Sequence, residues 1–345
     1  MNSTPNWTGG AQRGLQWAAE SQRQIVTIFD PAYPVLLAEI AAPPIVLFVS
    51  GVGESINDPQ IAVVGSRKST HVGLEVAERL GRALSKLGLT VTSGRARGID
   101  CAAHRGALDA GGRTVAVFGC GIDRIYPAEH RKLALKIAGM GALVSEFPLG
   151  SPPQPYHFPR RNKIISGLSY GTVVLEVALK SGSVSTARHA LEQGREVFAV
   201  PGSVRNSLAA GCHRLIKQGA TLVDTIDDIV EQLPAAASAN AAPPTERDLV
   251  QQDLNVSLNA QEQCLLEACG FDPATFDEVM QRSGLTALEV SSILFALEVR
   301  GLVRSLAGNT YLKTTQMNAL SGAVVWVAQD MNDRWPVLHH GPLSQ

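Results

Sequence analysis

The chain has 345 residues, enough for two or three domains, and its 45% hydrophobic content is enough for a packed core. No apolar run approaches the roughly 18 residues of a membrane span, and the first residues lack the basic-then-apolar order of a signal peptide. The five cysteines are odd in number and never stand in C-x-x-C spacing. This composition argues against a membrane span, a secreted disulfide scaffold and a structural zinc site, and it indicates a reduced, cytoplasmic protein.

The formal net charge is only −1, but the charges are segregated along the chain. Residues 61–220 hold 22 Lys+Arg and 10 Asp+Glu, a charge of +12, whereas the other residues hold 8 and 21, a charge of −13. Such a distribution is typical of an anion-binding core with acidic appendages. The alternative is a solvated surface whose asymmetry arises by chance, and the charges alone leave it open.

Residues 25–50 precede the first regular pattern, after a short N-terminal extension over 1–24. The stretch "DPAYPVLLAEIAAPP" (30–44) carries too many prolines for a long helix. The following "PIVLFVSG" (44–51) has the length of a buried strand. We expect this segment to dock as an extension on the domain that follows.

Between residue 61 and about residue 233, short β-rich apolar runs alternate with helical patterns. The helical pattern after the first run places apolar residues every three or four positions on one face, and Gly88 then ends it. Repeated βα units predict an extended Rossmann-like fold, a doubly wound and mostly parallel sheet with helices on both faces. The expected strands are 61–65, 89–93, 114–119, 142–146, 172–178, 196–202 and 220–224.

Residues 234–258 are rich in Pro, Ala, Ser and Asn and are predicted to form a linker. Three helix starts follow, each with a capping pair and a later glycine stop: Asn259 with Glu262, Thr275 with Glu278, and Thr286 with Glu289. The last stretch, 302–313, has the pattern of a hairpin. Three short helices and a hairpin predict a small winged-helix domain over 259–313, and residues 314–345 form a tail whose "AVVWVAQ" (323–329) is apolar enough to pack somewhere.

Parallel sheets bind ligands at the carboxyl ends of their strands, so the residues after each predicted strand are the candidate site. Glycines there let the backbone approach a ligand, and amides at helix N-termini attract phosphate. Several of these loops also carry Arg or Lys, which favours a polyanion. The candidate DNA-binding residues are Gly65, Ser66, Arg67, Ser93, Gly94, Arg97, Gly98, Gly119, Gly121, Arg160, Arg161, Asn162 and Lys163.

Other chemistries have weaker support. A dinucleotide fingerprint is absent, because "GCGIDR" (119–124) has Arg124 where the third glycine belongs, and there is no Walker motif. The histidines have no metal-ligand spacing, so we expect no metal and no cofactor. Ser93 and Cys120 stand at strand ends without assignable His-Asp partners, so a catalytic nucleophile is not indicated.

Six stretches come in a fixed order: "VVGSRKST", "SGRARGIDCAAHRGAL", "GCGIDRIYPAEH", "HFPRRNKIISGLS", "SGSVSTARHALEQGREVFAVPG" and "GCHRLIKQGA". In this order and spacing the chain resembles the DprA/Smf family, DNA-processing protein A, nearly continuously over about 25–233. The 259–313 module is similar to the winged-helix domain of that family. The resemblance implies a Rossmann-type protein without known catalysis that binds single-stranded DNA, forms a homodimer and loads RecA recombinase onto incoming DNA during natural transformation.

The chain departs from the family pattern at three places. Arg95 stands where the family usually has leucine, and Cys120 replaces a small hydroxyl or similar residue. The N-terminal helical domain of many members is missing here or reduced to residues 1–24. Any interaction that belongs to that domain is therefore not implied for this chain.

The stretch "HFPRRNKIISG" (157–167) concentrates three cations within four positions. Arg160, Arg161 and Lys163, in the first turns of a helix, are expected to hold consecutive phosphates of a single strand, with Arg67 on the same path. The alternative is that Arg160 or Arg161 pairs with an acidic neighbour and braces the loop. Phe158 is either a stacking platform for bases or a buried anchor.

Three functions compete at this level. The first is a non-enzymatic single-strand-binding recombination mediator. The second is a nucleotide phosphoribohydrolase-like enzyme, suggested by Glu176 and the Gly-Ser-rich turn within 171–187, although a single carboxylate on an apolar strand is often structural. The third is a transcription regulator, suggested by the winged helix alone. The third helix of that domain has no cation until Arg300, which favours protein contact or autoregulation over duplex reading.

Overall fold

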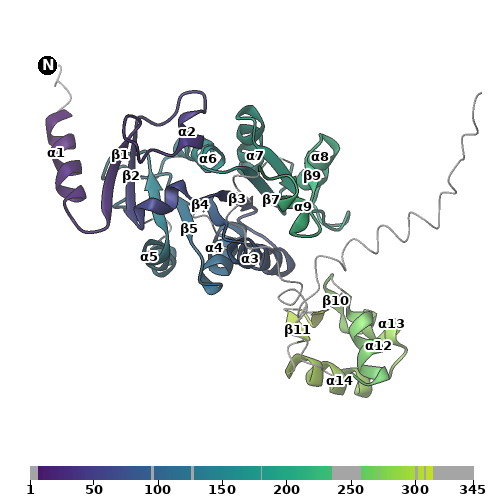
Figure 1. The fold of residues 1–345 in the computed structure, drawn as a ribbon. Coiled ribbons are helices and arrows are strands. Elements are labelled where there is room, and N and C mark those ends of the chain that lie inside the picture. Colours follow the sequence, from purple (N-terminus) through teal and green to yellow (C-terminus); the bar gives the residue numbers. More distant parts are fainter. Residues whose placement is uncertain are drawn as a thin grey trace, which may run out of the picture. The chain divides into compact units, whose positions relative to one another are not determined.

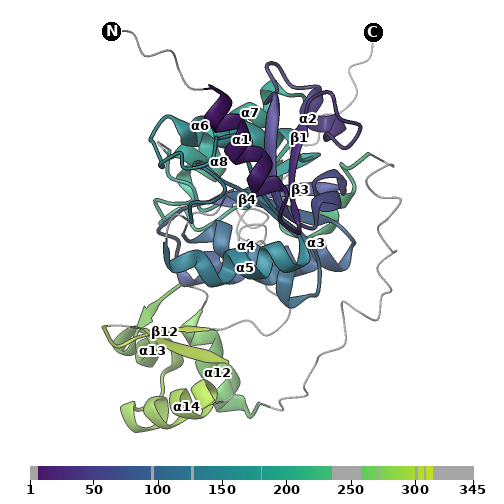
Figure 2. The same ribbon diagram turned by 90° about the vertical axis from the view of Figure 1, so that its left-hand side faces the viewer.

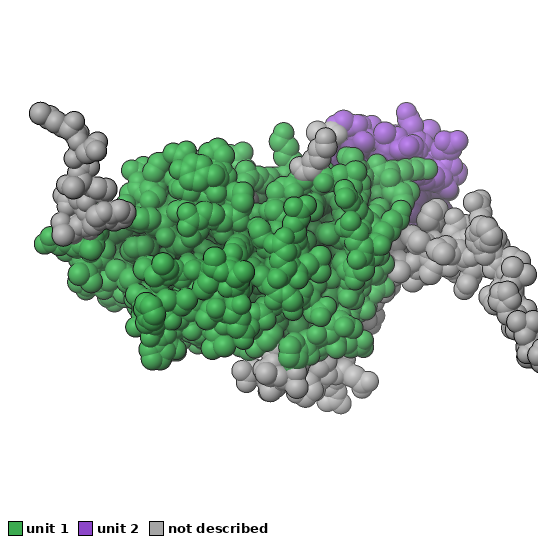
Figure 3. Space-filling model, turned by 90° about the horizontal axis from the view of Figure 1, so that it is seen from above, with its two compact units in different colours: residues 1–243 green, residues 244–345 purple. Residues whose placement is uncertain are grey.

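The computed structural model describes residues 7–94, 97–125, 128–179, 181–234, 258–270, 272–299, 302–306 and 308–313. The chain divides into two compact units, residues 1–243 and residues 244–345, which Figure 3 shows in green and purple. Most of the predicted linker and the whole predicted tail lie outside the described residues, as does Arg95. Within those residues, no helix combines the length and the apolar character that crossing a membrane requires.

The first unit is built on a sheet of nine strands within the described residues. Its order is β1-β2-β6-β5-β4-β3-β7-β8-β9, and the strands from β3 to β9 all run parallel. The bounds are β1 Arg23–Thr27, β2 Val46–Gly51, β3 Gln60–Gly65, β4 Thr90–Gly94, β5 Thr114–Val117, β6 Ala142–Ser145, β7 Gly171–Leu175, β8 Glu196–Ala199 and β9 Thr221–Leu222.

Helices cover both faces of this sheet (Figure 1). One face carries α2 Val35–Ala38, α6 His157–Gly167, α7 Gly182–Glu192 and α8 Ala210–Lys217. The other face carries α1 Trp7–Ala18, α3 His71–Lys86, α4 Ile99–Asp109, α5 Arg131–Met140 and α9 Asp227–Val230. Figure 2 shows α4 and α5 on the opposite side of the strands from α6 and α7. Among the described residues of this unit are two short 3-10 turns, η1 Gly53–Asn57 and η2 Ala128–His130. The predicted doubly wound, mostly parallel α/β fold is confirmed.

The predicted strand bounds are too long at several carboxyl ends. β7 ends at Leu175 rather than at residue 178, because Glu176 adopts a left-handed φ of 44° that breaks the extended backbone. β5 ends at Val117, so Gly119 already belongs to the loop. The segment 25–50 does dock on the sheet, and it does so by adding the antiparallel strands β1 and β2 beside β6.

The second unit has the predicted winged-helix order. Its elements are α12 Ala260–Cys269, β10 Ala274–Thr275, α13 Phe276–Ser283, α14 Ala287–Val299, β11 Val303–Leu306 and β12 Thr310–Lys313. Capping boxes at Asn259 and Thr275 start α12 and α13, as the sequence predicts. The hairpin β11–β12 is also as expected, and the two-residue strand β10 adds to β12. Sequence reasoning missed β10 because it is short and ends at the residue that caps α13.

Candidate nucleic-acid interface

The loops that follow β3 and β4 pack backbone against backbone. Gly98 has a φ of 78°, and a Cβ added there would lie 2.1 Å from the carbonyl oxygen of Ser66. The Ile99 amide donates to that same oxygen at 3.2 Å. Only glycine fits this close approach, so Gly98 fixes the loop of Ser66 and Arg67 against the start of α4.

The ring of Phe158, at the start of α6, has two guanidinium groups close to it. The Cζ of Arg67 is 5.3 Å from the ring centroid, and that of Arg161 is 5.9 Å away. A Cβ added at Gly119 would come 3.1 Å from the same ring. Phe158 is half-buried, so it is neither a fully buried anchor nor a fully exposed platform. The loops after β3 and β5 and the helix α6 therefore meet at one aromatic ring with two positive charges.

Arg161 is the buried member of this cluster, with 6% of its surface exposed. Its Nη1 donates to the Val117 carbonyl at 3.1 Å, while its Nε is buried without a hydrogen-bond partner among the described residues. Burial lowers the pKa of the guanidinium, the nearby Asp100 carboxylate raises it, and Arg67 lowers it again. A guanidinium with one donor left unused by the described residues can still contribute to binding an anionic ligand.

Gly94 makes room for two buried charged side chains, Arg161 and Asp100. A Cβ at Gly94 would lie 2.0 Å from the Arg161 Nη1 and 2.6 Å from an Asp100 carboxylate oxygen. Asp100 itself is 5% exposed and stands in the first turn of α4. Asp100 is not among the predicted site residues, although it lies within "SGRARGID", two residues after Gly98.

Arg160 points elsewhere and pairs with an acidic neighbour. Its Nη2 donates to a Glu146 carboxylate oxygen at 2.6 Å, and its Cζ lies 5.4 Å from the centroid of the Phe147 ring. The Glu146 side chain is 9% exposed, and its second oxygen is buried without a hydrogen-bond partner in the described part of the chain. The alternative recognised in the sequence, a brace, describes Arg160 in this structure.

We expect Arg160→Ala to lower the free energy of unfolding by about 1–3 kcal/mol, because it strips the buried Glu146 carboxylate of its hydrogen bond. Urea unfolding of Arg160→Ala, Glu146→Gln and the double variant measures this, and the double variant should recover part of the loss. Arg97→Ala is the matched control: Arg97 pairs with Glu129, which is 55% exposed, so its loss should stay below about 1 kcal/mol. Equal losses for Arg160→Ala and Arg97→Ala would contradict a bracing role.

The other two polar residues of the stretch also hold the protein together. The Lys163 Nζ donates to the carbonyl oxygens of Ala41 and Ala42. The buried Asn162 donates to the Gly182 carbonyl at 3.2 Å and to the Ser185 hydroxyl at 3.0 Å, which ties α6 to α7. The residues 160–163 therefore point to different sides of α6, because successive residues of a helix are rotated by about 100°.

The remaining candidates divide between surface and interior. Gly65 lies in the interior, where a Cβ would meet the Leu175 carbonyl at 2.2 Å. Ser93 is fully buried, and its hydroxyl donates to the Val63 carbonyl at 2.5 Å, so its side chain does not face the surface. Arg97 is exposed but pairs with Glu129. Gly121 packs against Asp123 and the Pro148 carbonyl.

His157 is a further residue of the site, and its interpretation from the sequence as a surface or capping histidine is wrong. Its ring is buried, stacks on Phe147 at 3.9 Å between centroids, and contacts the Gly119 carbonyl through Nδ1 at 3.2 Å. It thus joins α6 to the loop after β5. Its place immediately before Phe158 in the sequence was the available signal.

Glu176 lies where the strand order reverses, at the carboxyl end of β7 beside β3. Its carboxylate accepts hydrogen bonds from the Thr70 amide at 2.7 Å and from Asn206 at 3.3 Å. Thr70 in turn caps α3. A ligand would bind at this switch point in many doubly wound folds, but here Glu176 is bonded to the start of α3.

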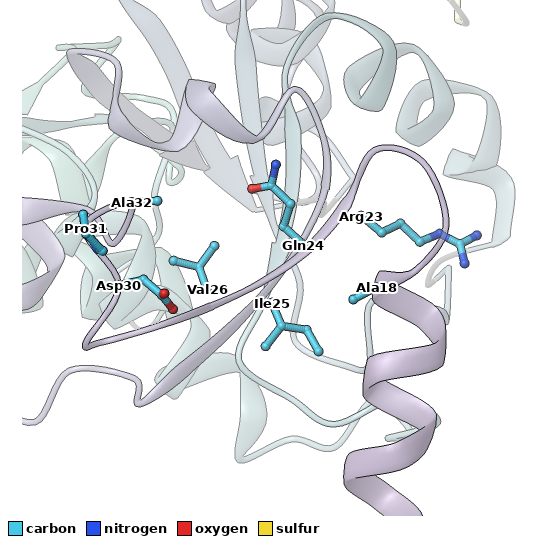
Figure 4. Close-up of a pocket in the computed structure, with 8 residues that line it drawn as sticks. All are labelled: Ala18, Arg23, Gln24, Ile25, Val26, Asp30, Pro31 and Ala32. Carbon is cyan, nitrogen blue, oxygen red and sulfur yellow. The ribbon is translucent and has the colours of Figure 1, made fainter.

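No group of three or more His, Cys, Asp or Glu side chains in the described part of the chain is placed to hold a metal ion. A cavity of about 520 Å³ lies beside the edge strand β1 (Figure 4). None of the candidate DNA-binding residues is among its described lining residues, which are Ala18, Arg23, Gln24, Ile25, Val26, Asp30, Pro31 and Ala32.

Comparison with protein families decides the relationship of the chain. The family model "DNA recombination-mediator protein A" matches residues 24–234, and "DprA winged helix domain" matches residues 234–309. The chain belongs to the DprA/Smf family. The resemblance seen in the sequence is thereby confirmed, and the second match agrees with the winged-helix order of the second unit.

Relatives of the DprA/Smf family match over most of the chain. The protein Smf of Escherichia coli is 41% identical over 302 residues, covering 86% of this chain and 79% of the relative. The crystal structure of DprA from Streptococcus pneumoniae is 38% identical with a TM-score of 0.61, covering 65% of this chain and 78% of that one. DprA from Helicobacter pylori is 28% identical with a TM-score of 0.55, covering 60% and 94%, and its structure is described as showing a unique single-stranded DNA binding mode.

Proposed function

We propose that this DNA-processing protein binds single-stranded DNA at the carboxyl ends of the parallel strands, where Arg67, Phe158 and Arg161 meet. One observation carries the proposal: the Phe158 ring lies within 6 Å of both guanidinium groups, 5.3 Å from Arg67 and 5.9 Å from Arg161. A flexible single strand presents phosphates and unstacked bases in succession. Guanidinium groups attract the phosphates, and an aromatic ring stacks on bases of any kind.

The binding is independent of sequence and prefers single strands. Phosphate contacts carry no sequence information, and stacking tolerates every base. The candidate residues supply cations, glycines and one ring rather than the helix or ribbon that reads a major groove. The H. pylori relative, whose structure is described by its single-stranded DNA binding mode, supports the same ligand class.

Beyond binding single-stranded DNA, the more specific role that we assign to the protein is that of a recombination mediator. The protein acts as a homodimer without catalysis, protects incoming single strands and loads RecA recombinase onto them during natural transformation, in the cytoplasm. Membership of a family described as DNA recombination-mediator protein A supports this role. The bonded state of Glu176 supports a structural rather than a hydrolytic task for that carboxylate.

Gel shifts with a labelled oligonucleotide test the proposal. Unlabelled single strands should displace the probe, duplex of equal length should compete weakly, and mononucleotides should not compete. The affinity should fall with salt at a log–log slope of about −0.7 for each phosphate neutralised. Affinity independent of salt, a preference for duplex, or displacement by a mononucleotide would each contradict single-strand binding at this edge.

A further inference from the structure

The outward face of α14, the helix that reads DNA in many winged-helix domains, is apolar in this chain. Leu288 is 78% exposed and Phe295 is 70% exposed. Seven positions separate them, which is two turns, so they lie on the same side of the helix. α14 lies at the periphery of its unit (Figure 1). Two large apolar side chains are therefore presented together to solvent.

This stripe is not needed for the core of the winged-helix domain. The opposite side of α14 supplies that core through Val290, Leu294 and Leu297, each of which is at most 2% exposed. The core also includes residues of α12 and α13. Leu288 and Phe295 are not part of this core, and the domain has a packed interior without them.

The two carboxylates of α14 are held by hydrogen bonds within the domain and add negative charge, not positive charge, to this helix. Glu289 accepts hydrogen bonds from the amide of Thr286 at 2.9 Å and from its hydroxyl at 2.6 Å. Glu298 accepts from the Ser305 hydroxyl at 2.5 Å. Ser292, between the two apolar residues, donates its hydroxyl to the Leu288 carbonyl at 2.9 Å. The stripe therefore suits an apolar segment and not a phosphate backbone.

The chain itself supplies such a segment directly after this domain. β12 ends at Lys313, and residues 323–328 read "AVVWVA", an uncharged run with three valines and a tryptophan. The intervening residues 314–322 can span up to about 30 Å. A domain of about 55 residues has a radius of gyration of only about 10 Å. The connection is therefore about three times as long as the radius of gyration of the domain, and the tether gives the segment a high effective concentration there.

We propose that residues 323–328 dock in cis on the apolar stripe of α14 formed by Leu288, Ser292 and Phe295. This inference concerns the second unit alone and does not depend on single-strand binding by the first.

Hydrogen exchange of the full chain, read by mass spectrometry, tests the docking. In the natural chain, amides of 323–331 should exchange at least tenfold more slowly than in an unstructured peptide. Leu288→Ser with Phe295→Ser should remove this protection while leaving the exchange of α12 and α13 unchanged, because both residues are exposed. The matched control is Leu191→Ser on α7, an exposed leucine of the first unit, which should leave the tail protected.

Three results would overturn the proposal. Exchange of 323–331 at the unstructured rate in the natural chain would mean that the segment does not dock. Protection that survives Leu288→Ser with Phe295→Ser would place the segment elsewhere. Protection that rises with protein concentration would identify a second copy as the occupant.

Discussion

Arg67→Glu is expected to reduce the affinity for single-stranded DNA at least about 100-fold, because repulsion of phosphate is added to a lost attraction. Arg67 is exposed and stands beside Phe158 and the buried Arg161, so its charge is the accessible one of that pair. The salt slope of any residual binding should fall by about 0.7 for the lost phosphate. Fluorescence anisotropy with a labelled oligonucleotide at several salt concentrations measures both quantities.

Lys86→Glu is the matched control for Arg67→Glu. It changes the net charge by the same amount. Lys86 ends α3 shortly before β4 begins, at the amino-terminal ends of the parallel strands, whereas Arg67 follows the carboxyl end of β3. Its affinity should stay within a few-fold of the natural protein. Both variants should unfold within about 1 kcal/mol of it, since exposed cations contribute little to stability. Equal losses of affinity for the two variants would show that net charge, rather than this edge, governs binding.

The sequence predicted the fold well where local signals and tertiary structure agree. Runs such as 61–65 and 142–146 became parallel strands, and Gly88, with a φ of 74°, follows the end of α3. The prediction failed at the end of β7. Nothing local announces that Glu176 turns away from the strand, because its conformation is tied to hydrogen bonds with Thr70, 106 positions away in sequence.

The candidate site was predicted by its region rather than by its geometry. Cationic residues that are neighbours in the sequence were expected to face the same strand of DNA. A helix instead distributes their side chains around its axis. Arg161 points to the Val117 carbonyl, Arg160 to Glu146 and Lys163 to the 41–42 backbone. Sequence could not identify these partners, because each lies on a distant segment that only folding brings near.

Buried counter-charges explain why residues that resemble DNA ligands also support the fold. Arg161 faces Asp100, and Arg160 faces Glu146, so each cation offsets a carboxylate with little access to water. A buried charge is costly unless it is paired. A variant of Arg160 or Arg161 can therefore lose binding because a DNA contact is lost or because the fold is weakened. Stability must be measured beside affinity to tell these two causes apart.

Arg161→Met is expected to lower the free energy of unfolding by about 1–3 kcal/mol, because it removes the hydrogen bond to the buried Val117 carbonyl and the positive charge near the buried Asp100 carboxylate. Met retains most of the apolar stem, so the loss reports charge more than volume. Asp100→Asn in the same chain removes the facing negative charge and should restore a large part of the stability. Urea unfolding of both single variants and of the double variant measures the coupling.

The double variant then isolates the part that Arg161 plays in binding. With Asp100→Asn and Arg161→Met together, the chain is expected to be folded at 25 °C while the Phe158 ring keeps Arg67 as its remaining guanidinium neighbour. Affinity about tenfold lower than that of Asp100→Asn alone would assign a phosphate contact to Arg161, at about 1.4 kcal/mol. Unchanged affinity would confine Arg161 to the fold. An Arg161→Met variant as stable as the natural chain would instead contradict the proposed contribution of Arg161 to the fold.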